Sequence, residues 1–519
     1  MRFDPLTRLR HDRRLQVIAG VLVVALCAGL FLAFLVPRSP SGPKRLTDAG
    51  QAGSDDPGSA GSALSRQPGS AGPGSLSGGS AGSAGRAGKA GSAGSKGRPK
   101  SGPGSGVGRL GPGGVPLDGP EDGPGAPGNF ASDTGVTDKR ITLGFLRPVP
   151  TGTPISDDDL FNRPEHAYAR DINGHGGIHG RNVQIIDEPF DPLLPSEVAR
   201  ACQDLKDNNA FAVLNEGYFD GRCLIANHIF FSHGGPASAG QYASGLEFSV
   251  SASAERLLRN WVQGLAARGD GYRIQGKNVG TVEPSVSDVT SQQEINQGFV
   301  GPLQGYGVNP TRTNPDCLNP STIQLAVSRM KLAGVNAVFL MTDLCAGPAF
   351  INEANNQQFF PQYHTSDFFG AAEDFWAGQV TRRQGLNGAL GMTSWRTGGP
   401  LVGQPERAVE AACRDRYRQQ TAIGLSPDDT PDAQGNRTYE FAEEICGLMN
   451  DFAAGANING GNLTRDRLSQ AYRSLGTHQF PNNADITYSA NKFDGGDSQR
   501  AVKWDEGCDS NNGCYKPMD

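Results

Sequence analysis

From residue 140 onward, short apolar runs alternate with helix-like segments, and this alternation restricts the possible folds more than any other feature of the sequence. The strand-like runs cover residues 141–146, 182–187, 211–214, 278–282 and 336–342. The helix-like segments cover residues 163–173, 196–208, 253–268, 290–300 and 322–333, and others follow near 406–421, 439–453 and 464–475. Uninterrupted apolar runs of this length are typical of buried parallel strands. Repeated β–α units therefore predict an α/β fold built on doubly wound parallel sheets.

The segment that carries this pattern, residues 134–519, is too long for one hydrophobic core. A single core stops growing at about 250–300 residues, so we expect two lobes. The whole chain has a formal charge of −6, but its early segments are basic, which leaves −12 on residues 134–519. Because neutralising phosphates requires a cationic surface, this acidic domain argues against nucleic acid as a partner.

Residues 15–36 form an uncharged and almost wholly apolar run near the N-terminus. A helix of this length would extend about 33 Å, enough to cross a hydrocarbon core of about 30 Å. Residues 1–14 contain five Arg and two Asp, so the positive-inside rule keeps this basic tail in the cytoplasm. We therefore expect a single-pass anchor in the cell membrane, with the globular domain outside the cytoplasm.

Residues 15–36 have two alternative interpretations. A cleaved signal peptide has an apolar core of only about 7–15 residues and a small-residue cleavage site, whereas Val36-Pro37-Arg38 follows this run. A lipoprotein signal needs a small residue before a lipidated Cys, but Cys27 follows Leu26 in the middle of the run. An uncleaved anchor is the preferred interpretation, with cleavage as the alternative.

Residues 38–133 are rich in Gly, Ser, Ala and Pro and contain 27 of the 72 glycines of the chain. Such a segment cannot bury enough apolar surface to offset its chain entropy, so we expect a disordered linker. A flexible coil of this length spans about 55 Å, from roughly 5.6 Å times the square root of the residue number. The dinucleotide-like and hydrolase-like glycine motifs inside it lack the flanking strand and helix that such motifs require.

Eight of the nine cysteines lie beyond the linker, and an even number in an exported domain indicates disulfides. Eight cysteines allow 105 pairings, so the connectivity cannot be deduced strictly. Proximity along the chain suggests the pairs Cys202–Cys223, Cys317–Cys345, Cys413–Cys446 and Cys508–Cys514. Metal ligands or free thiols are the alternative interpretation, although no Cys-x-x-Cys motif or close Cys/His cluster is present.

The segment from Ala167 to Val183 resembles the connection between the first helix and the second strand of type I periplasmic solute-binding proteins, a family that includes the branched-chain amino-acid receptors of ABC transporters. Its pattern is Ile-Asn, a Gly-Gly pair and then Ile-x-Gly-Arg leading into a strand. The resemblance continues in order over most of residues 138–506, including the closing segment 487–504. The sequence departs from the family at the second and third loops and in its number of cysteines.

This resemblance implies a two-lobed clamp in which three crossover segments form a hinge and closure buries a ligand. Residues just beyond the predicted strands, and two in a further loop, Ser238 and Tyr242, are then the candidates for ligand binding. Those beyond the strands are Thr151, Tyr218, Phe219, Glu283 and Asp343. Hydroxyls and main-chain amides would bind a carboxylate, and the two acids would pair with an ammonium. The aromatic side chains would cover an apolar or ring-shaped ligand.

Motifs for covalent or metal chemistry are weak in this sequence. Ser232-His233-Gly234-Gly235 is similar to an oxyanion-hole loop, but residues 134–519 lack the Gly-x-Ser-x-Gly motif that supplies the nucleophile. His175 and His179 have the i, i+4 spacing of metal ligands, but two glycines between them argue against a helix. We therefore expect no enzyme activity, no cofactor and no metal site.

The sequence supports one main hypothesis, a membrane-tethered extracytoplasmic solute-binding protein that feeds an ABC permease. It would capture a small polar, amino-acid-like solute by hinge closure. The alternative is a sensory or scaffold ectodomain with the same clamp fold, because a fold does not determine a function. An extracytoplasmic hydrolase is a third and weaker interpretation.

Overall fold

The computed structural model describes residues 122–149, 164–192, 194–217, 219–267, 274–284, 289–342, 345–372, 374–381, 383–396, 405–427, 438–508 and 513–518. The chain divides into two compact units, residues 1–96 and 97–519, and all described residues belong to the second. The predicted anchor at residues 15–36 lies outside the described residues, as do Thr151, Tyr218 and Asp343. Within the described ranges, no helix has both the length and the apolar character needed to span a bilayer.

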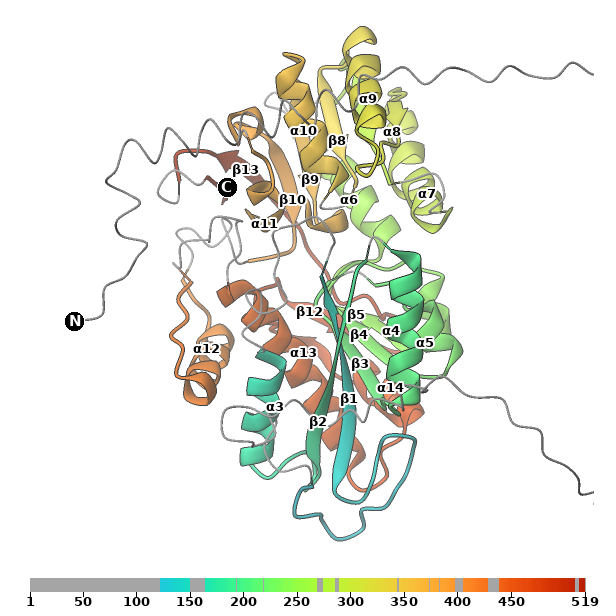
Figure 1. Ribbon diagram of the computed structural model, residues 1–519, viewed down its shortest axis with the longest axis vertical. Coiled ribbons are helices and arrows are strands. Elements are labelled where there is room, and N and C mark those ends of the chain that lie inside the picture. Colours follow the sequence, from blue (N-terminus) through green and yellow to red (C-terminus); the bar gives the residue numbers. More distant parts are fainter. Residues whose placement is uncertain are drawn as a thin grey trace, which may run out of the picture. The chain divides into compact units, whose positions relative to one another are not determined.

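The first sheet contains five parallel strands in the order β2-β1-β3-β4-β5. These strands are β1 (Arg140–Pro148), β2 (Asn182–Phe190), β3 (Ala212–Asn215), β4 (Phe230–His233) and β5 (Glu247–Ser249). One face is covered by α4 (Pro195–Asp207) and α5 (Arg222–Ala226). The other face is covered by α3 (Pro164–Gly174), α12 (Ala408–Thr421), α13 (Thr438–Asn459) and α14 (Arg465–Arg473). Helices on both faces of a parallel sheet make this part, called lobe 1, doubly wound (Figure 1).

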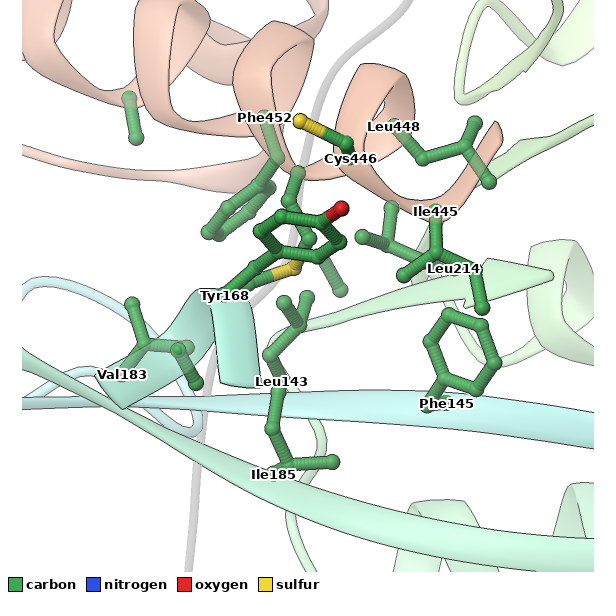
Figure 2. Close-up of a cluster of buried hydrophobic side chains, with 14 of the residues drawn as sticks. Leu143, Phe145, Tyr168, Val183, Ile185, Leu214, Ile445, Cys446, Leu448 and Phe452 are labelled. Carbon is green, nitrogen blue, oxygen red and sulfur yellow. The ribbon is translucent and has the colours of Figure 1, made fainter. Parts of the chain in front are cut away.

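Alternate residues of β1 and β2 supply the core between the sheet and α13. Leu143 and Phe145 of β1 lie beside Ile185 of β2, facing Tyr168 of α3 and Ile445 of α13 (Figure 2). Residues two apart on a strand share one face, so the same strands also serve the core on the α4 side. Full burial of such a side chain contributes roughly 1.5–3 kcal/mol, which explains why the apolar runs specify these strands.

The second sheet contains seven strands in the order β14-β13-β10-β9-β8-β6-β7. These strands are β6 (Val279–Val282), β7 (Thr311–Thr313), β8 (Ala337–Leu340), β9 (Gln362–Ser366), β10 (Leu390–Thr393), β13 (Arg500–Asp505) and β14 (Cys514–Pro517). The pairs β10–β13 and β13–β14 are antiparallel. This sheet, in lobe 2, is therefore mixed rather than wholly parallel as predicted, because the returning chain adds its last strands at one edge.

Lobe 2 also has a helical layer on each face of its sheet. One layer consists of α9 (Pro320–Leu332), α10 (Ala346–Asn356) and α11 (Asp374–Gly378). The other consists of α6 (Ala254–Ala267), α7 (Val289–Ile295), the π-helical stretch η2 (Asn296–Val300) and α8 (Gly301–Gly305). The single helix predicted over 290–300 is thus interrupted where its winding widens. A small antiparallel pair, β11 (Gly476–His478) and β12 (Ile486–Tyr488), completes the described strands.

The predicted linker ends at residue 133, whereas in the structure the chain contacts lobe 1 from Gly123, whose amide donates to the carbonyl of Lys139 at 2.9 Å. The buried guanidinium of Arg181 donates from Nε to the carbonyl of Thr137 at 2.7 Å and from Nη2 to that of Phe130 at 3.3 Å. The amide of Arg465 donates to Asp133 Oδ2 at 2.9 Å. These bonds attach the segment before β1 to the lobe, which its Gly-rich composition alone did not predict.

The four disulfides expected from proximity along the chain are present, joining Cys202 to Cys223, Cys317 to Cys345, Cys413 to Cys446 and Cys508 to Cys514. The third joins α12 to α13, as predicted. The first two lie beside strand ends: Cys223 lies in α5, which follows β3, and Cys345 precedes α10, which follows β8. Each lobe thus has one disulfide next to a loop in which a ligand residue was predicted.

Candidate functional site

The carboxyl ends of the strands in both lobes meet the segments that connect the lobes. At the end of β5, Ser249 pairs in parallel with Asp494, and its carbonyl accepts from the amide of Gly495 at 2.6 Å. At the end of β10, Thr393 pairs with Arg500, where β13 begins. The three connecting segments run from β5 to α6, from β10 to α12 and from β12 to β13. All three therefore attach at the carboxyl edges of the two sheets.

Asp494 holds the first and third connecting segments together. Its Oδ2 accepts from the amide of Ser253 at 2.8 Å and from Nε of Arg256 at 2.9 Å. Arg256 lies in α6, the first helix of lobe 2. The Asp494 carboxylate therefore links the first connecting segment, which leads into lobe 2, to the third connecting segment, which leaves lobe 1. A hydrogen-bonded joint of a few residues is the kind of element that can act as a hinge.

The carboxyl edge of lobe 1 is built from main-chain groups and small side chains. Asn215, at the end of β3, donates from Nδ2 to the carbonyl of Leu146 at 2.9 Å, and its own carbonyl accepts from the amide of Gly234 at 2.9 Å. Ser249 Oγ donates to the carbonyl of Gly235 at 2.6 Å, and Ser251 Oγ donates to that of Gly234 at 2.5 Å. The loop after β4 is thus fixed between β3 and the first connecting segment.

Gly234 is required by the close approach of other elements to this loop. A Cβ at this position would lie 1.9 Å from the carbonyl oxygen of Glu216 and 1.6 Å from Oε1 of Glu444 on α13. Both acids are more than nine-tenths buried. The loop after β4 therefore lies directly against the main chain that follows β3 and against the Glu444 carboxylate of α13.

His233 and Ser232, which the sequence placed in an oxyanion-like loop, are consecutive residues of β4. Successive strand residues face opposite sides of a sheet, so the two side chains cannot act as a pair. The His233 ring stacks on Phe231 with centroids 4.6 Å apart, and its Nε2 lies 3.3 Å from Oε1 of Glu247. His233 and Glu247 are fully buried, which indicates a structural role in the sheet.

At the carboxyl edge of lobe 2, the acid that follows β6 forms a buried ion pair. Glu283, which directly follows β6, accepts from Nε and Nη2 of Arg312, both at 2.7 Å, and from Thr281 Oγ1 at 2.6 Å. The carboxylate is fully buried. Because this carboxylate already accepts three hydrogen bonds and has no access to solvent, the geometry does not favour Glu283 as the partner of a ligand ammonium.

A second acid of lobe 2, Asp367, lies where β9 ends and touches the second connecting segment. Its Oδ2 accepts from the amide of Ser394 at 2.6 Å and from Ser394 Oγ at 2.8 Å. Burial raises the pKa of Asp367 to about 6, although these hydrogen bonds act in the opposite direction. This carboxyl group therefore links the end of β9 to the second connecting segment.

The predicted ligand-binding residues that the structure describes have different surroundings. Phe219 was predicted to cover a ligand, but it packs edge-on against Phe190 at 5.1 Å and Phe231 at 5.9 Å in the core of lobe 1. This packing uses the ring of Phe219 in the core and does not favour the predicted contact with a ligand.

Ser238 and Tyr242 lie together in the loop between β4 and β5, where Tyr242 belongs to the short helix η1 (Gln241–Ser244). Tyr242 is 6% exposed, and its hydroxyl accepts from the amide of Ala237 at 3.3 Å. Ser238 is half-buried, and its amide donates to Gln241 Oε1 at 2.9 Å. Ser238 is the more accessible of the two, whereas the Tyr242 hydroxyl is already used within the loop.

The site residues that the sequence prediction missed are Gly234, Gly235, Ser249, Ser251, Glu444 and Asp367. The sequence did not reveal these residues because the strands before them are hard to recognise. β4 is short and ends in Ser-His, and β5 has only three residues. Recognising Phe230 and Phe231 as a strand would have placed the following Gly-Gly pair at the carboxyl edge.

Two cavities lie elsewhere, at the amino edges of the sheets. One, of about 450 Å³, is lined by Gln362 and Leu390, where β9 and β10 begin. The other, of about 350 Å³, is lined by Arg140, where β1 begins. Ligands of open α/β sheets bind at the opposite, carboxyl edge, so neither cavity belongs to the candidate site. A separate cluster of Glu165, His166 and Asp187 could hold a metal ion.

No protein-family model matches the sequence, and no curated protein is significantly similar to it. Among solved structures, a fatty acid ABC transporter substrate-binding protein from Thermomonospora curvata has a TM-score of 0.57 at 15% identity, over 75% of this chain and 95% of that one. A type 1 periplasmic binding protein from Bordetella pertussis Tohama I has a TM-score of 0.55 at 16% identity, over 73% and 100%.

A third similar structure is the leucine-, isoleucine-, valine-, threonine- and alanine-binding protein from Brucella ovis in its closed conformation. Its TM-score is 0.54 at 12% identity, over 73% of this chain and 94% of that one. At these identities the likeness shows the fold. The structure therefore has the type I periplasmic-binding-protein fold that the segment from Ala167 to Val183 predicted.

Proposed function

We propose that this chain, with its type I periplasmic-binding-protein fold, is an extracytoplasmic solute-binding protein that captures a small polar solute between its lobes. The observation that carries the proposal is that all three connecting segments join the lobes at the carboxyl edges of both sheets. Ligands of open α/β sheets bind outside the carboxyl ends of the strands. Two lobes joined by a short hinge can close over a ligand held there.

An amino-acid-like solute fits the two edges best. Lobe 1 offers the hydroxyl of the half-buried Ser238 in the loop after β4, which suits a carboxylate. In lobe 2, Glu283 is occupied by Arg312, so Asp343, which follows β8 in sequence, becomes the candidate for an ammonium. Thr151 and Tyr218 remain candidates from their positions after β1 and β3. The Brucella ovis protein is named as an amino-acid-binding protein, which supports this class of solute.

Delivery to an ABC permease is part of the proposal. The solved structures from Thermomonospora curvata and Brucella ovis are named as substrate-binding or amino-acid-binding proteins, and the first is named as part of an ABC transporter. The apolar run at residues 15–36 would anchor the chain in the membrane, and the Gly-rich segment would tether the domain to it. Membrane fractionation with and without residues 15–36 tests the anchor.

The binding proposal is tested by a thermal-shift screen of the full chain in mild detergent. The panel contains the twenty amino acids, their amides, small peptides, and fatty acids as a second ligand class. A ligand that binds the folded state raises Tm, and closure lowers the radius of gyration in small-angle scattering. A panel that gives neither effect contradicts solute capture.

A site variant sharpens that screen. Asp343→Ala is expected to weaken the affinity for an amino-acid ligand at least tenfold without changing Tm in the absence of ligand. Asp466→Ala is the matched control, because Asp466 is 70% exposed on lobe 1 and lies in α14. Equal affinities of the two variants would remove Asp343 from the site.

Normal solute uptake after deletion of the whole protein, with a signalling response lost, would favour the sensory alternative.

A further inference from the structure

On the face of lobe 1 that α3 covers, the apolar pattern of the sheet changes to charge at the carboxyl end. Leu143 and Phe145 are followed on the same face of β1 by Arg147, because side chains two apart share a face. Likewise Ile185 is followed by Asp187 on β2. Glu165, the second residue of α3, lies over these charges.

Three potential metal ligands converge there from two elements. A carboxylate oxygen of Glu165, a ring nitrogen of His166 and a carboxylate oxygen of Asp187 all lie within 4.8 Å of one another. Glu165 Oε1 is 3.8 Å from His166 Nε2. Glu165 is fully buried and His166 is 4% exposed. One imidazole and two carboxylates form a donor set that binds zinc and neighbouring divalent ions.

Glu165 is the independent sign that a cation belongs in this cluster. Among the described residues, neither of its carboxylate oxygens forms a hydrogen bond, although the side chain is completely buried. An ionised carboxylate is costly to bury without hydrogen bonds or a counter-charge. A bound cation would remove this cost directly.

Arg147 holds the carboxylate of Asp187, the third potential ligand, in place. Its Nε donates to Asp187 Oδ1 at 3.1 Å, and its Nη2 lies 3.0 Å from Oδ2. Each carboxylate oxygen retains a second lone pair, so Asp187 can be held in place by the guanidinium and still bind a metal. Outer partners of this kind commonly orient metal ligands.

We propose that Glu165, His166 and Asp187 form a binding site for a divalent transition-metal ion such as Zn²⁺. The ion would join the start of α3 to the end of β2 at the carboxyl edge of lobe 1. This site differs from the solute-binding edge formed by β3, β4 and β5, and it departs from the absence of metal expected from the sequence. Metal binding is measured without any solute, so a chain that binds no metal would contradict this proposal but not the proposed solute binding.

The test uses the full chain in mild detergent, stripped with EDTA and dialysed. Titration with Zn²⁺ by calorimetry is expected to show one ion per chain. Co²⁺ is expected to give the visible absorption of a protein-bound ion. Glu165→Gln and His166→Gln are each expected to weaken Zn²⁺ binding about 100-fold or more, since loss of an outer partner alone costs about 10–100-fold.

Two control variants separate this site from other causes. Glu443→Gln changes another fully buried carboxylate without a hydrogen bond among the described residues, but one outside the cluster, and is expected to leave Zn²⁺ affinity within twofold. His175→Gln removes an exposed imidazole beside Asp171 and is also expected to have no effect. Circular dichroism checks that Glu165→Gln folds, and His166→Gln gives an independent answer if it does not. A stripped chain that binds no ion, or binding that persists in both cluster variants, overturns the proposal.

Discussion

The loops at the carboxyl edges of the two lobes are held in place by different kinds of interaction. Lobe 1 fixes its loops with main-chain hydrogen bonds and small residues around Gly234 and Ser251. Lobe 2 uses buried acids, with Glu283 bound to Arg312 and Asp367 bound to Ser394. The part of the lobe 1 edge around β4 should therefore be sensitive to added volume, and the edge of lobe 2 to changes of charge.

Removing a charge from lobe 2 should have the largest effect. Arg312→Ala leaves the Glu283 carboxylate fully buried without its bidentate partner. Breaking a buried pair in this way costs about 4 kcal/mol of unfolding free energy. Urea unfolding followed by circular dichroism measures the loss.

The control for this charge effect is an exposed ion pair in lobe 1. The side chains of Arg222 and Asp220 are 64% and 31% exposed, so Arg222→Ala is expected to cost less than about 1 kcal/mol. If the two Arg variants differ by less than about 1 kcal/mol, burial of charge does not distinguish the lobes.

Adding one methyl group to lobe 1 should have the next largest effect. In Gly234→Ala the new Cβ meets the main-chain oxygen of Glu216 at 1.9 Å, and main chain cannot rotate away as the Glu444 side chain can. Overpacking of this kind costs about 3 kcal/mol. Gly240→Ala is the matched control in the same loop, because its nearest neighbour would be Ser238 Oγ at 3.9 Å. Equal urea midpoints for the two variants would show that the edge of lobe 1 tolerates volume.

These contacts also show why the site was harder to predict than the fold. Apolar runs identified β1, β2 and β3 because most of their apolar side chains are buried, and proximity along the chain identified all four disulfides. The contact between Gly234 and Glu444 joins residues about 210 positions apart, and no local pattern encodes it. The same is true of the bonds from Arg181 that attach the end of the predicted linker.

A smaller, pH-dependent effect is expected from Asp367 in lobe 2. Its pKa is raised from 3.8 to about 6 by burial, so the folded state binds this proton more tightly than the unfolded state. Unfolding free energy should therefore fall as pH rises from about 4 to about 6, by about 2 kcal/mol from this group. The measurement is urea unfolding at a series of pH values.

Asp367→Asn isolates this contribution, because the amide oxygen can still accept from Ser394 but cannot ionise. The variant is expected to show a shallower decline over this pH range than the wild type. Asp466→Asn is the control, since its side chain is 70% exposed and far along the chain from the hinge. Identical slopes for the wild type and Asp367→Asn would show that the hinge acid does not titrate there.

The smallest effect concerns a hydroxyl in lobe 1. In Tyr242→Phe the buried amide of Ala237 loses the hydroxyl that accepts its hydrogen bond, which should cost about 1 kcal/mol. Tyr306→Phe is the control, because Tyr306 is 39% exposed and water can replace its contacts. A loss well above that of Tyr306→Phe means that Tyr242 stabilises the loop after β4, as its 6% exposure suggests. If stability is unchanged and solute affinity falls, Tyr242 acts on the ligand as the sequence predicted, and the edge of lobe 1 recognises its solute with side chains as well as main chain.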